Sequence, residues 1–448
     1  MVSKLMDSLA HKDQQYIWHP FTPYTEVSKV IPLSHAQGVY LYTAEGREIL
    51  DAISSWWVNL HGHSHPHIAQ SLATQALKLE HVIFAGFTHE PAVTLAERLL
   101  AILPDNQEKI FYSDNGSTAC EVGIKMAFQY WHNQGIRKPR IVALDGGYHG
   151  DTFGAMSVGD RSPFSAPFDP YLFEVYHLPF PTCSQSPCCG ASQTHHQDCA
   201  RAAQVIAEFE TLAATGEVGA FIYEPLIQGA SGMRMYSPEI LDKLLGIAAR
   251  YDIITIADEV MTGFGRTGKL FASEYCTLKP DILCLSKGLT GGTLALGVTS
   301  CTGRIFEAFK AAELAKTFFH GHSFTANPLA CAAANASLDL LLTANCQRDI
   351  ERISAKQAAF AQTMRQHPAI RQARHFGTIV ALEIDTDRET SYFNEARSWL
   401  YDYFLSKDIL LRPLGNVLYV LPPYIITNEE LERIYRVIGQ LLDERFGA

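Results

Sequence analysis

"DILCLSKGLTGG" (residues 281–292) is an apolar run that ends in a single lysine, Lys287, and continues at once into glycines. A lysine beside a buried strand is costly unless its charge is removed or used in chemistry. Two earlier runs have the same form, since "DIITIADEV" (252–260) ends with acids and "GAFIYEP" (219–225) ends in Glu-Pro. The three runs predict buried strands that each place a polar side chain at their carboxyl end.

Helical patterns alternate with such runs along the middle of the chain. "KIFYS" (109–113) leads through a glycine turn into a helical segment in which Thr118 and Glu121 have capping-box spacing. "RIVAL" (140–144) leads into "DGGYHG". Alternating strands and helices predict an α/β fold with a mostly parallel central sheet, in which ligands bind at the carboxyl ends of the strands.

The character of the sequence changes after about residue 330, where an alanine-rich helix is followed by amphipathic helices and short strands. We therefore expect a large domain over 66–330 and a smaller α+β domain over 331–448, with the N-terminal segment 1–65 packing against the smaller domain. A polar stretch rich in cysteine and histidine, 183–199, has no role that the sequence predicts.

The composition is that of a globular protein, with 47% hydrophobic and 19% charged residues among 448. A net charge of −11 argues against nucleic acid and anionic membranes as partners. No apolar run approaches the roughly 18 residues of a membrane span, and the N-terminus lacks the apolar core of a signal peptide. We therefore expect a cytoplasmic protein whose ten cysteines are thiols.

Asp258 and Lys287 lie one strand and one turn apart, so both side chains can face one crevice. Each has a plain structural explanation, because a buried carboxylate often pairs with arginine and a lysine often packs its stem while its ammonium reaches water. Together they fit pyridoxal phosphate, whose aldehyde bonds a lysine amine as a Schiff base and whose ring nitrogen needs an acid. "SDNGSTACE" (113–121) adds a helix start with hydroxyls that suits the phosphate, or an ordinary capped helix.

The segments "DEVMTGFGRTGKLFA" (258–272) and "KPDILCLSKGLTGG" (279–292) resemble the signature of the class III, pyridoxal-phosphate-dependent aminotransferases of fold type I. The resemblance runs from about residue 16 to 426 and is strongest to the members that make 7,8-diaminononanoate in biotin synthesis. It implies pyridoxal 5'-phosphate as cofactor, 8-amino-7-oxononanoate as acceptor and S-adenosylmethionine as amino donor. It also implies a homodimer with active sites at the subunit interface. Further segments that carry it are "IWHPFT", "SSWWVNLHGH", "KMAFQYW", "GYHGDTFGAMSV", "EPLIQGASGMRMY", "NPLACAAANASL" and "RPLGNVLYVLPPYII".

The resemblance implies a role for individual residues of this chain. Lys287 bonds the cofactor, Asp258 pairs with its ring nitrogen, and Tyr148 lies over the ring as the third catalytic residue. The cofactor-binding residues that it implies are Gly116, Ser117, Tyr148, Asp258, Val260, Lys287, His322 and Ser323, the last two supplied by the partner subunit. The substrate-binding residues that it implies are Phe21, Trp56, Tyr148, Arg266, Lys287, Gly321 and Arg412. Arg412 would grip the acceptor's carboxylate, which suits an arginine in an apolar run, although a surface arginine with a packed stem has the same pattern.

Two segments depart from the pattern of the members that use S-adenosylmethionine. Phe21 stands where they commonly have tyrosine, and His322-Ser323 stands where they commonly have Pro-Thr. Ser323 keeps a hydroxyl for the phosphate. Relatives that take lysine as amino donor resemble this chain at both places, so lysine stays open as the alternative donor.

Other functions compete with this interpretation. "GFGRTG" (263–268) fits G-x-G-x-x-G, but no acid ends the following strand, which disfavours a nicotinamide dehydrogenase. "HGHSHPHI" (61–68) and stretch 183–199 lack paired C-x₂-C spacing, so we expect no metal site. Another class III enzyme acting on ω-amino acids remains an alternative. A non-catalytic pyridoxal-phosphate-binding protein is disfavoured because Lys287 and Asp258 are both present.

Overall fold

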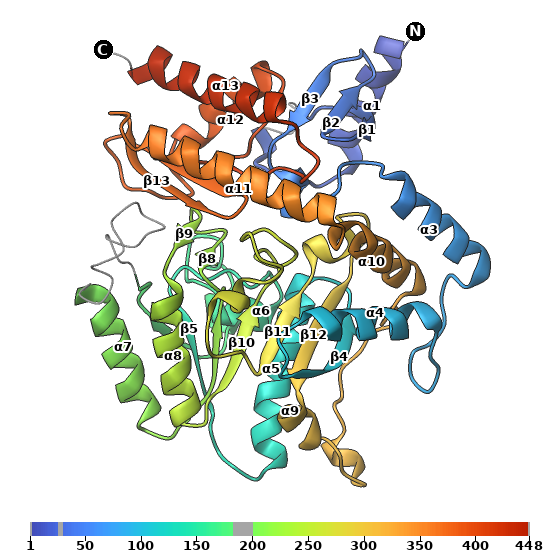
Figure 1. Cartoon of the computed structure of the whole chain (residues 1–448), viewed down its shortest axis with the longest axis vertical. Helices are drawn as coiled ribbons and strands as arrows, with labels where there is room; N and C mark the ends of the chain where they lie inside the picture. The colour runs from blue at the N-terminus through green and yellow to red at the C-terminus, as the bar shows by residue number, and fades with distance from the viewer. Residues whose placement is uncertain (1, 26–29, 182–199, 447–448) are drawn as a thin grey trace.

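A seven-stranded sheet lies in the larger part of the molecule (Figure 1). The computed structural model describes residues 2–25, 30–181 and 200–446. The strands stand in the order β4-β12-β11-β10-β7-β5-β6, and β12 runs antiparallel to both of its neighbours while the others pair in parallel. They are β4 (Gln107–Ser113), β5 (Arg140–Leu144), β6 (Tyr176–Leu178), β7 (Val218–Tyr223), β10 (Ile254–Asp258), β11 (Ile282–Leu285) and β12 (Gly297–Thr302). This mostly parallel sheet confirms the predicted α/β fold.

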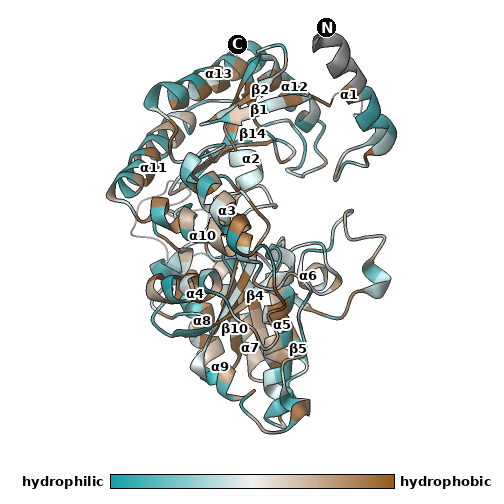
Figure 2. Ribbon diagram, turned by 90° about the vertical axis from the view of Figure 1, so that its right-hand side faces the viewer, coloured by the Kyte–Doolittle hydropathy of each residue, from teal (hydrophilic) through white to brown (hydrophobic). Residues whose placement is uncertain are grey.

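Helices cover this sheet, and hydrophobic residues concentrate on the strands and on the helix faces against them (Figure 2). The helices are α3 (Pro66–Lys78), α4 (Glu90–Ile102), α5 (Gly116–Asn133), α6 (Phe153–Val158), α7 (Ala200–Ala213), α8 (Pro238–Arg250), α9 (Gly303–Glu307) and α10 (Pro328–Leu341). Ile256 and Cys284 pack with Val122 of α5 in one apolar cluster, whereas their neighbours Ala257 and Leu283 belong to another. Alternate side chains of one strand are thus buried on opposite faces, as expected of a covered parallel sheet.

Helix α5 begins with a cap that the sequence placed one turn too late. Asn115 is the N-cap: its side chain accepts a hydrogen bond from the Thr118 N–H (2.9 Å), and Thr118 Oγ1 accepts one from the Asn115 N–H (3.1 Å). Glu121 instead accepts two backbone N–H groups at the start of α6 (2.7 and 3.0 Å). The prediction was wrong because Gly116, taken as part of a turn, is the first residue of the helix.

The smaller part combines strands from both ends of the chain (Figure 1). One sheet has the order β1-β2-β3-β15, in which β15 pairs in parallel with β3, and another has the order β13-β14-β16. These strands are β1 (Leu33–Gln37), β2 (Tyr40–Thr43), β3 (Glu48–Asp51), β13 (Ile370–Phe376), β14 (Ile379–Ile384), β15 (Ile409–Leu410) and β16 (Val417–Val420). The accompanying helices are α11 (Ala344–Met364), α12 (Ala396–Ser406) and α13 (Asn428–Phe446). The remaining elements are α1 (Val2–Tyr16), α2 (Ser54–Trp57), β8 (Ile227–Gln228) and β9 (Arg234–Met235).

The alanine-rich helix α10 leads from the large sheet to the smaller part. Ala333 and Ala336 pack against Ile68 of α3, and their small side chains let the two helices approach closely. Within the described ranges, no single helix is long and apolar enough to cross a membrane; α10 and α11 reach that length only together, across a bend of 71°.

Candidate active site

A pocket of about 680 Å³ lies at the carboxyl ends of the central strands. Glu224 follows β7, Asp258 ends β10 and Lys287 follows β11 closely, so three adjacent strands deliver side chains to it. Asp258 and Lys287, which spacing predicted to share one crevice, line this pocket together. The other lining residues are Trp57, Val58, Asn115, Gly116, Ser117, Tyr148, His149, Gly150, Asp151, Thr152, Val260, Met261, Ser286, Gly292, Thr293, Leu294 and Ala295.

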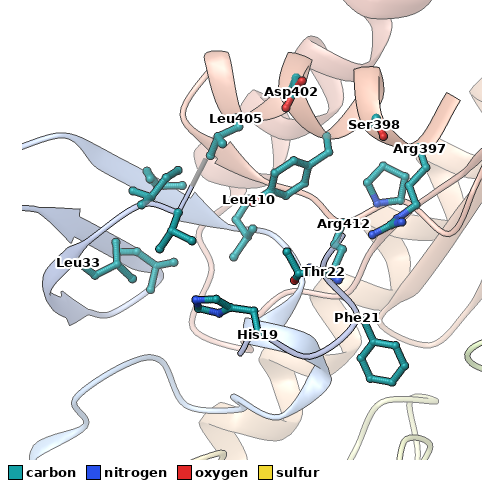
Figure 3. A pocket seen from close by; sticks show the side chains of 16 residues that line it. His19, Phe21, Thr22, Leu33, Arg397, Ser398, Asp402, Leu405, Leu410 and Arg412 are labelled. Carbon is teal, nitrogen blue, oxygen red and sulfur yellow. The ribbon is translucent and has the colours of Figure 1, made fainter. Parts of the chain in front are cut away.

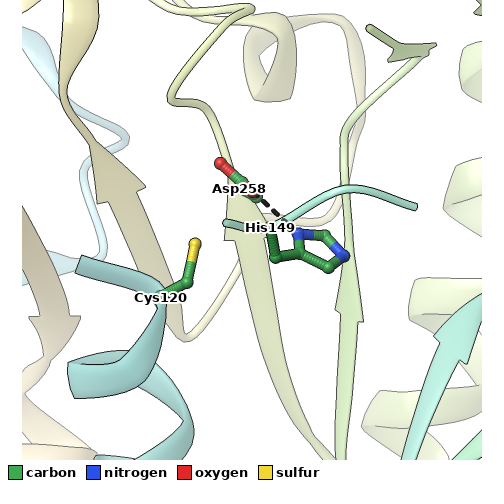
Figure 4. A group of neighbouring side chains, drawn as sticks. All are labelled: Cys120, His149 and Asp258. Carbon is green, nitrogen blue, oxygen red and sulfur yellow. Dashed lines mark hydrogen bonds and ion pairs between the residues drawn. The ribbon is translucent and has the colours of Figure 1, made fainter. Parts of the chain in front are cut away.

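Asp258 is buried and paired with His149 (Figure 4). His149 Nδ1 lies 2.7 Å from Asp258 Oδ2, and Asp258 Oδ1 accepts the Val260 N–H at 3.0 Å. Burial acts to lower the pKa of His149, but the hydrogen bonds and charges of Asp258 and Cys120 together outweigh it, and the pKa is raised to about 10. His149 is therefore a cation at neutral pH, held against the carboxylate of Asp258.

Cys120 lies beside this pair, and ligating atoms of Cys120, His149 and Asp258 are all within 4.8 Å of one another. Such a group can be compared with a three-ligand metal site. A metal bound at about 2.0–2.3 Å keeps its ligand atoms about 3 Å or more apart. The His149–Asp258 hydrogen bond is shorter than that, so the arrangement favours a proton between the two side chains over a metal ion.

Lys287 enters the pocket from the first position of a short 3₁₀ helix (Lys287–Thr290). Its Nζ lies 4.9 Å from the centre of the Trp57 ring, and it makes no hydrogen bond or ion pair within the described ranges. Burial lowers the pKa of the Lys287 amine, while the negative charges of Asp258 and Glu224 oppose that shift. A lysine with a lowered pKa supplies the neutral amine that attacks a carbonyl.

The start of α5 lies on the wall of the pocket and has the features that suit an anion. The first N–H groups of the helix, at Gly116 and Ser117, lie at the positive end of the helix dipole, which favours an anion. Ser117 Oγ lies 2.8 Å from Thr152 Oγ1 and accepts the Thr152 N–H at 3.1 Å. A Cβ added at Gly116 would come within 2.7 Å of Val260 Cγ1, so only glycine fits here.

Tyr148 and Glu224 form a second group at the pocket wall. Glu224 accepts the N–H groups of Tyr148 (3.0 Å) and Gly229 (2.9 Å). Burial raises the pKa of Glu224 to about 7, although the charge of His149 opposes the shift. The Tyr148 hydroxyl donates to Asp151 Oδ2 (3.0 Å), and burial raises its pKa, so Tyr148 is a neutral donor at neutral pH.

A left-handed turn, Ser54–Trp57, places Trp57 in the pocket and Trp56 beside Arg412 and Phe21. Its four residues have φ of 52°, 46°, 80° and 74°, and residues with a Cβ adopt this conformation at a cost of roughly 1–2 kcal/mol each. Trp57 is buried over Lys287 and its indole N–H donates to the Tyr419 hydroxyl (3.0 Å). Trp56 is 38% exposed and points to the other side.

Arg266, expected near the substrate, is not among the residues that line the pocket, although its charge contributes to lowering the pKa of Lys287. Its side chain is fully buried and donates to the carbonyl oxygens of Pro422 (2.9 Å), Asn59 (3.0 Å) and Trp57 (3.3 Å). Burial lowers the pKa of Arg266, and within the described ranges it has no ion-pair partner. The guanidinium of Arg266 therefore holds the end of the turn Ser54–Trp57 through the backbone carbonyl groups of Trp57 and Asn59.

Phe21 and Arg412 line a second pocket, of about 300 Å³, between the N-terminal segment and α12 (Figure 3). Trp56 contacts both of them: its ring centre lies 4.7 Å from the Arg412 guanidinium and 5.8 Å from the Phe21 ring. Arg412 forms no ion pair with an acid in the part of the chain described here. Arg412 in the second pocket is thus available to bind an anion, and Trp56 packs against it.

Gly321, His322 and Ser323 lie outside both pockets of their own chain. The His322 N–H donates to Thr325 Oγ1 (3.1 Å), and its buried Nε2 has no partner among the described residues. The segment is flanked by exposed aromatic side chains, with Phe319 63% and Phe324 61% accessible.

Two of the segments considered for other functions, 61–68 and 263–268, lie within the described residues and form no such site there. Each of three histidines in 61–68 has its own partner, in the pairs His61–Ser337 (3.0 Å), His63–Asp51 (2.9 Å) and His67–Asp339 (2.8 Å). Residues 263–268 lie in turns after β10, and no helix begins at them. Stretch 183–199 lies outside the described residues.

Three residues of the site had no role in the sequence analysis: His149, Thr152 and Trp57. His149 could have been found, because it follows Tyr148 in a segment already singled out. Nothing local marks Thr152, whose partner Ser117 is 35 residues away. The sequence could not tell which of the two neighbouring tryptophans, Trp56 or Trp57, enters the pocket, because that depends on the shape of the turn.

Comparison with known proteins gives consistent matches over nearly the whole chain. A family model described as "Aminotransferase class-III" matches residues 23–442. The chain is similar to an adenosylmethionine-8-amino-7-oxononanoate aminotransferase of Synechococcus elongatus, at 48% identity over 96% of this chain and 99% of that protein. A protein of the same name from Helicobacter pylori is 37% identical over 98% of each.

Solved structures agree. The adenosylmethionine-8-amino-7-oxononanoate aminotransferase of Methanocaldococcus jannaschii matches with a TM-score of 0.88 at 34% identity, covering 97% of this chain and 99% of that one. An amine transaminase from an uncultivated Pseudomonas species, in its PLP-bound form, matches with a TM-score of 0.87 at 28% identity, covering 95% and 97%.

Proposed function

This chain belongs to the class III aminotransferases, and from that membership we propose that it transfers an amino group to 8-amino-7-oxononanoate. The product is 7,8-diaminononanoate, and the reaction is a step of biotin synthesis. The amino donor is S-adenosylmethionine and the cofactor is pyridoxal 5'-phosphate. The observation that carries the proposal is the pocket that Asp258 and Lys287 line together.

The residues present fit the cofactor. Lys287 offers an amine whose pKa is lowered by burial and that makes no hydrogen bond or ion pair in the described chain, which suits a covalent bond to the aldehyde. Gly116 and Ser117 offer helix N–H groups for the phosphate. When bound, the cofactor supplies an aldehyde that condenses with amines and a ring that takes up the electrons of a broken C–H bond.

Each polar residue of the pocket then has a task. Lys287, once released from the cofactor, is a free amine that removes the α-proton of the substrate and returns it. Asp258, which is hydrogen-bonded to His149, would pair with the ring nitrogen and favour its protonated form. Tyr148 and Val260, which line the pocket, would border the ring.

The acceptor is oriented by its far end. Trp56 lines the route of its chain, and Arg412, which is stacked on Trp56, binds the carboxylate in two hydrogen bonds. Phe21 packs against the other edge of Trp56. Arg266 contributes indirectly, because it fixes the turn that carries Trp56.

The active enzyme is a homodimer. Gly321, His322 and Ser323 would reach the phosphate and the substrate of a second copy of the chain, which accounts for their distance from their own pocket. Exposed Phe319 and Phe324 supply apolar surface for that contact. Association of two chains would also give the unpaired His322 Nε2 a partner.

The amino donor is tested by comparing two amines. We expect turnover with S-adenosylmethionine, measured as 7,8-diaminononanoate formed by the purified protein. Lysine is the second candidate, favoured by Phe21 and by His322-Ser323. Activity with lysine and none with S-adenosylmethionine would replace the donor and leave the acceptor half of the proposal standing.

We also propose a division of the chain into 1–65, 66–330 and 331–448, supported by the pairing of β3 with β15. A cytoplasmic location is supported by the free thiols of the described cysteines, six of which have no disulfide partner.

A further inference from the structure

We propose that Asp51, with Ser55 and His63, is a positioning group that holds the left-handed turn Ser54–Trp57 in the shape that places Trp57 in the active-site pocket and Trp56 against Arg412. The inference rests on the proposed function, because the tryptophans matter only if substrate binds between Lys287 and the outer pocket.

The Asp51 carboxylate is fully buried and accepts three hydrogen bonds. Oδ1 accepts the Ile53 N–H (3.1 Å), and Oδ2 accepts the Ser55 hydroxyl (2.8 Å) and the His63 Nε2–H (2.9 Å). A buried carboxylate is tolerated only when its oxygens are satisfied in this way. Asp51 ends β3 and pairs with Leu410 of β15, so it is a fixed point from which the turn can be held.

The proton on His63 can be placed from its second partner. Asn59 Nδ2 lies 3.3 Å from His63 Nδ1. An amide nitrogen only donates, so Nδ1 accepts, and a neutral imidazole then carries its proton on Nε2, facing Asp51. His63 thus supports the carboxylate without having to be charged.

The turn needs such support because its backbone is strained. Ser55 has φ 46° and ψ 46°, a region that residues with a Cβ avoid and that persists only when surrounding contacts impose it. Ser54 is held through its hydroxyl, which donates to the Leu421 carbonyl (2.8 Å), and Trp57 through Arg266. Ser55, between them, is held by Asp51.

The three side chains superficially resemble a Ser-His-Asp nucleophile. The Ser55 hydroxyl, however, donates directly to Asp51 and lies farther from His63 Nε2, at 3.4 Å. None of the three lines either pocket. Their arrangement therefore serves the shape of the turn and not a covalent step.

A matched pair of substitutions at Ser55 tests the inference in the full-length holoenzyme. Ser55→Ala removes the hydroxyl and keeps the Cβ that disfavours the left-handed region, whereas Ser55→Gly removes both. We expect Ser55→Ala to raise KM for 8-amino-7-oxononanoate about 10-fold with kcat within about 3-fold, and Ser55→Gly to restore KM to within about 3-fold of wild type. Equal KM values in wild type and Ser55→Ala, or equal impairment of both variants, would overturn it.

A readout independent of turnover is the melting temperature of the cofactor-free protein. Here Ser55→Ala should melt below Ser55→Gly, and the reverse order would count against strain at this residue. Asp51→Asn places either an NH₂ group or a weaker acceptor next to the groups that donate to Asp51, and it should reproduce the change in KM seen for Ser55→Ala. If Asp51→Asn does not fold, the comparison of Ser55→Ala with Ser55→Gly still tests the inference.

The two proposals fail separately. If the wild-type protein with bound cofactor shows no change of visible absorbance on adding S-adenosylmethionine or lysine, the aminotransferase function fails. If that change occurs while Ser55→Ala behaves as wild type, only the role of Asp51 is lost.

Discussion

His149 Nδ1 lies 2.7 Å from Asp258 Oδ2, and both side chains are buried at the floor of the pocket. Burial lowers the pKa of His149, but the hydrogen bonds and charges of Asp258 and Cys120 together overcome this effect and raise the pKa to about 10, whereas an unfolded histidine titrates at about 6.5. The ionisation of His149 is thus coupled to the stability of the fold.

This coupling predicts a pH dependence. A group whose pKa is raised by folding contributes stability fully below its unfolded pKa, and the contribution is lost as pH rises through the folded pKa. The free energy of unfolding of wild type should therefore exceed that of His149→Gln most at about pH 6, and the difference should shrink toward about pH 10. Urea denaturation of the cofactor-free proteins across this range measures it, and a difference that grows with pH would refute the assignment.

Lys287→Ala should bind the cofactor yet lose more than about 1000-fold in kcat, because both the covalent anchor and the proton carrier are gone. Single-wavelength titration with pyridoxal phosphate checks binding, and product formation checks turnover. Lys78→Ala is the matched control, since Lys78 is an exposed lysine paired with Glu90 (2.8 Å). Repeated turnover by Lys287→Ala would remove this lysine from its role.

Gly116→Ala should weaken cofactor binding by about 10-fold or more, because the new methyl group has to displace Val260 or shift the helix start that holds the phosphate. Equilibrium dialysis of pyridoxal phosphate against the cofactor-free variant gives the Kd. The double variant Gly116→Ala/Val260→Ala removes the clashing Cγ atoms and should recover most of the affinity. Failure of this rescue would mean that the helix start, and not the contact with Val260, requires glycine.

Arg412→Met should raise KM for 8-amino-7-oxononanoate by about 10- to 100-fold, which corresponds to about 1.5–3 kcal/mol for hydrogen bonds to a charged group. Initial rates at saturating donor measure this. Arg397→Met is the control, because Arg397 lines the same outer pocket but stacks on Tyr392 and not on Trp56. A similar rise of KM in Arg412→Met and Arg397→Met would mean that the substrate carboxylate is bound by the pocket as a whole and not by Arg412 specifically.

The sheet and its strand-end residues were predictable because both depend on local pattern. Continuous apolar runs mark strands buried on two faces, and the residue that ends each run falls at one edge of a parallel sheet. For this reason the amino-acid sequence alone could place Asp258 and Lys287 in one pocket.

Other parts of the site were not predictable, because they depend on distant segments. Four consecutive left-handed residues in "SSWW" contradict local propensity, and two of the contacts that hold them come from Leu421 and Arg266, far away in the sequence. Arg266 was expected near the substrate, but its three carbonyl partners come from residues 57, 59 and 422, which no periodicity brings together. Its burial behind the turn follows from those contacts.

A mixed dimer would test whether Gly321–Ser323 serve the site of a second copy. Lys287→Ala removes the amine that a chain supplies to its own site. Ser323→Glu disables the loop that a chain supplies to the site of its partner, because a carboxylate repels the phosphate. When both variants are co-expressed in equal amounts, half of the dimers are mixed, and one of the two sites in each mixed dimer combines an intact lysine with an intact loop. Because a two-fold dimer exchanges equivalent surfaces, activity should recover to about one quarter of wild type, although each variant alone is inactive. A loop that served its own chain would leave every site of the mixture defective, and no activity would return.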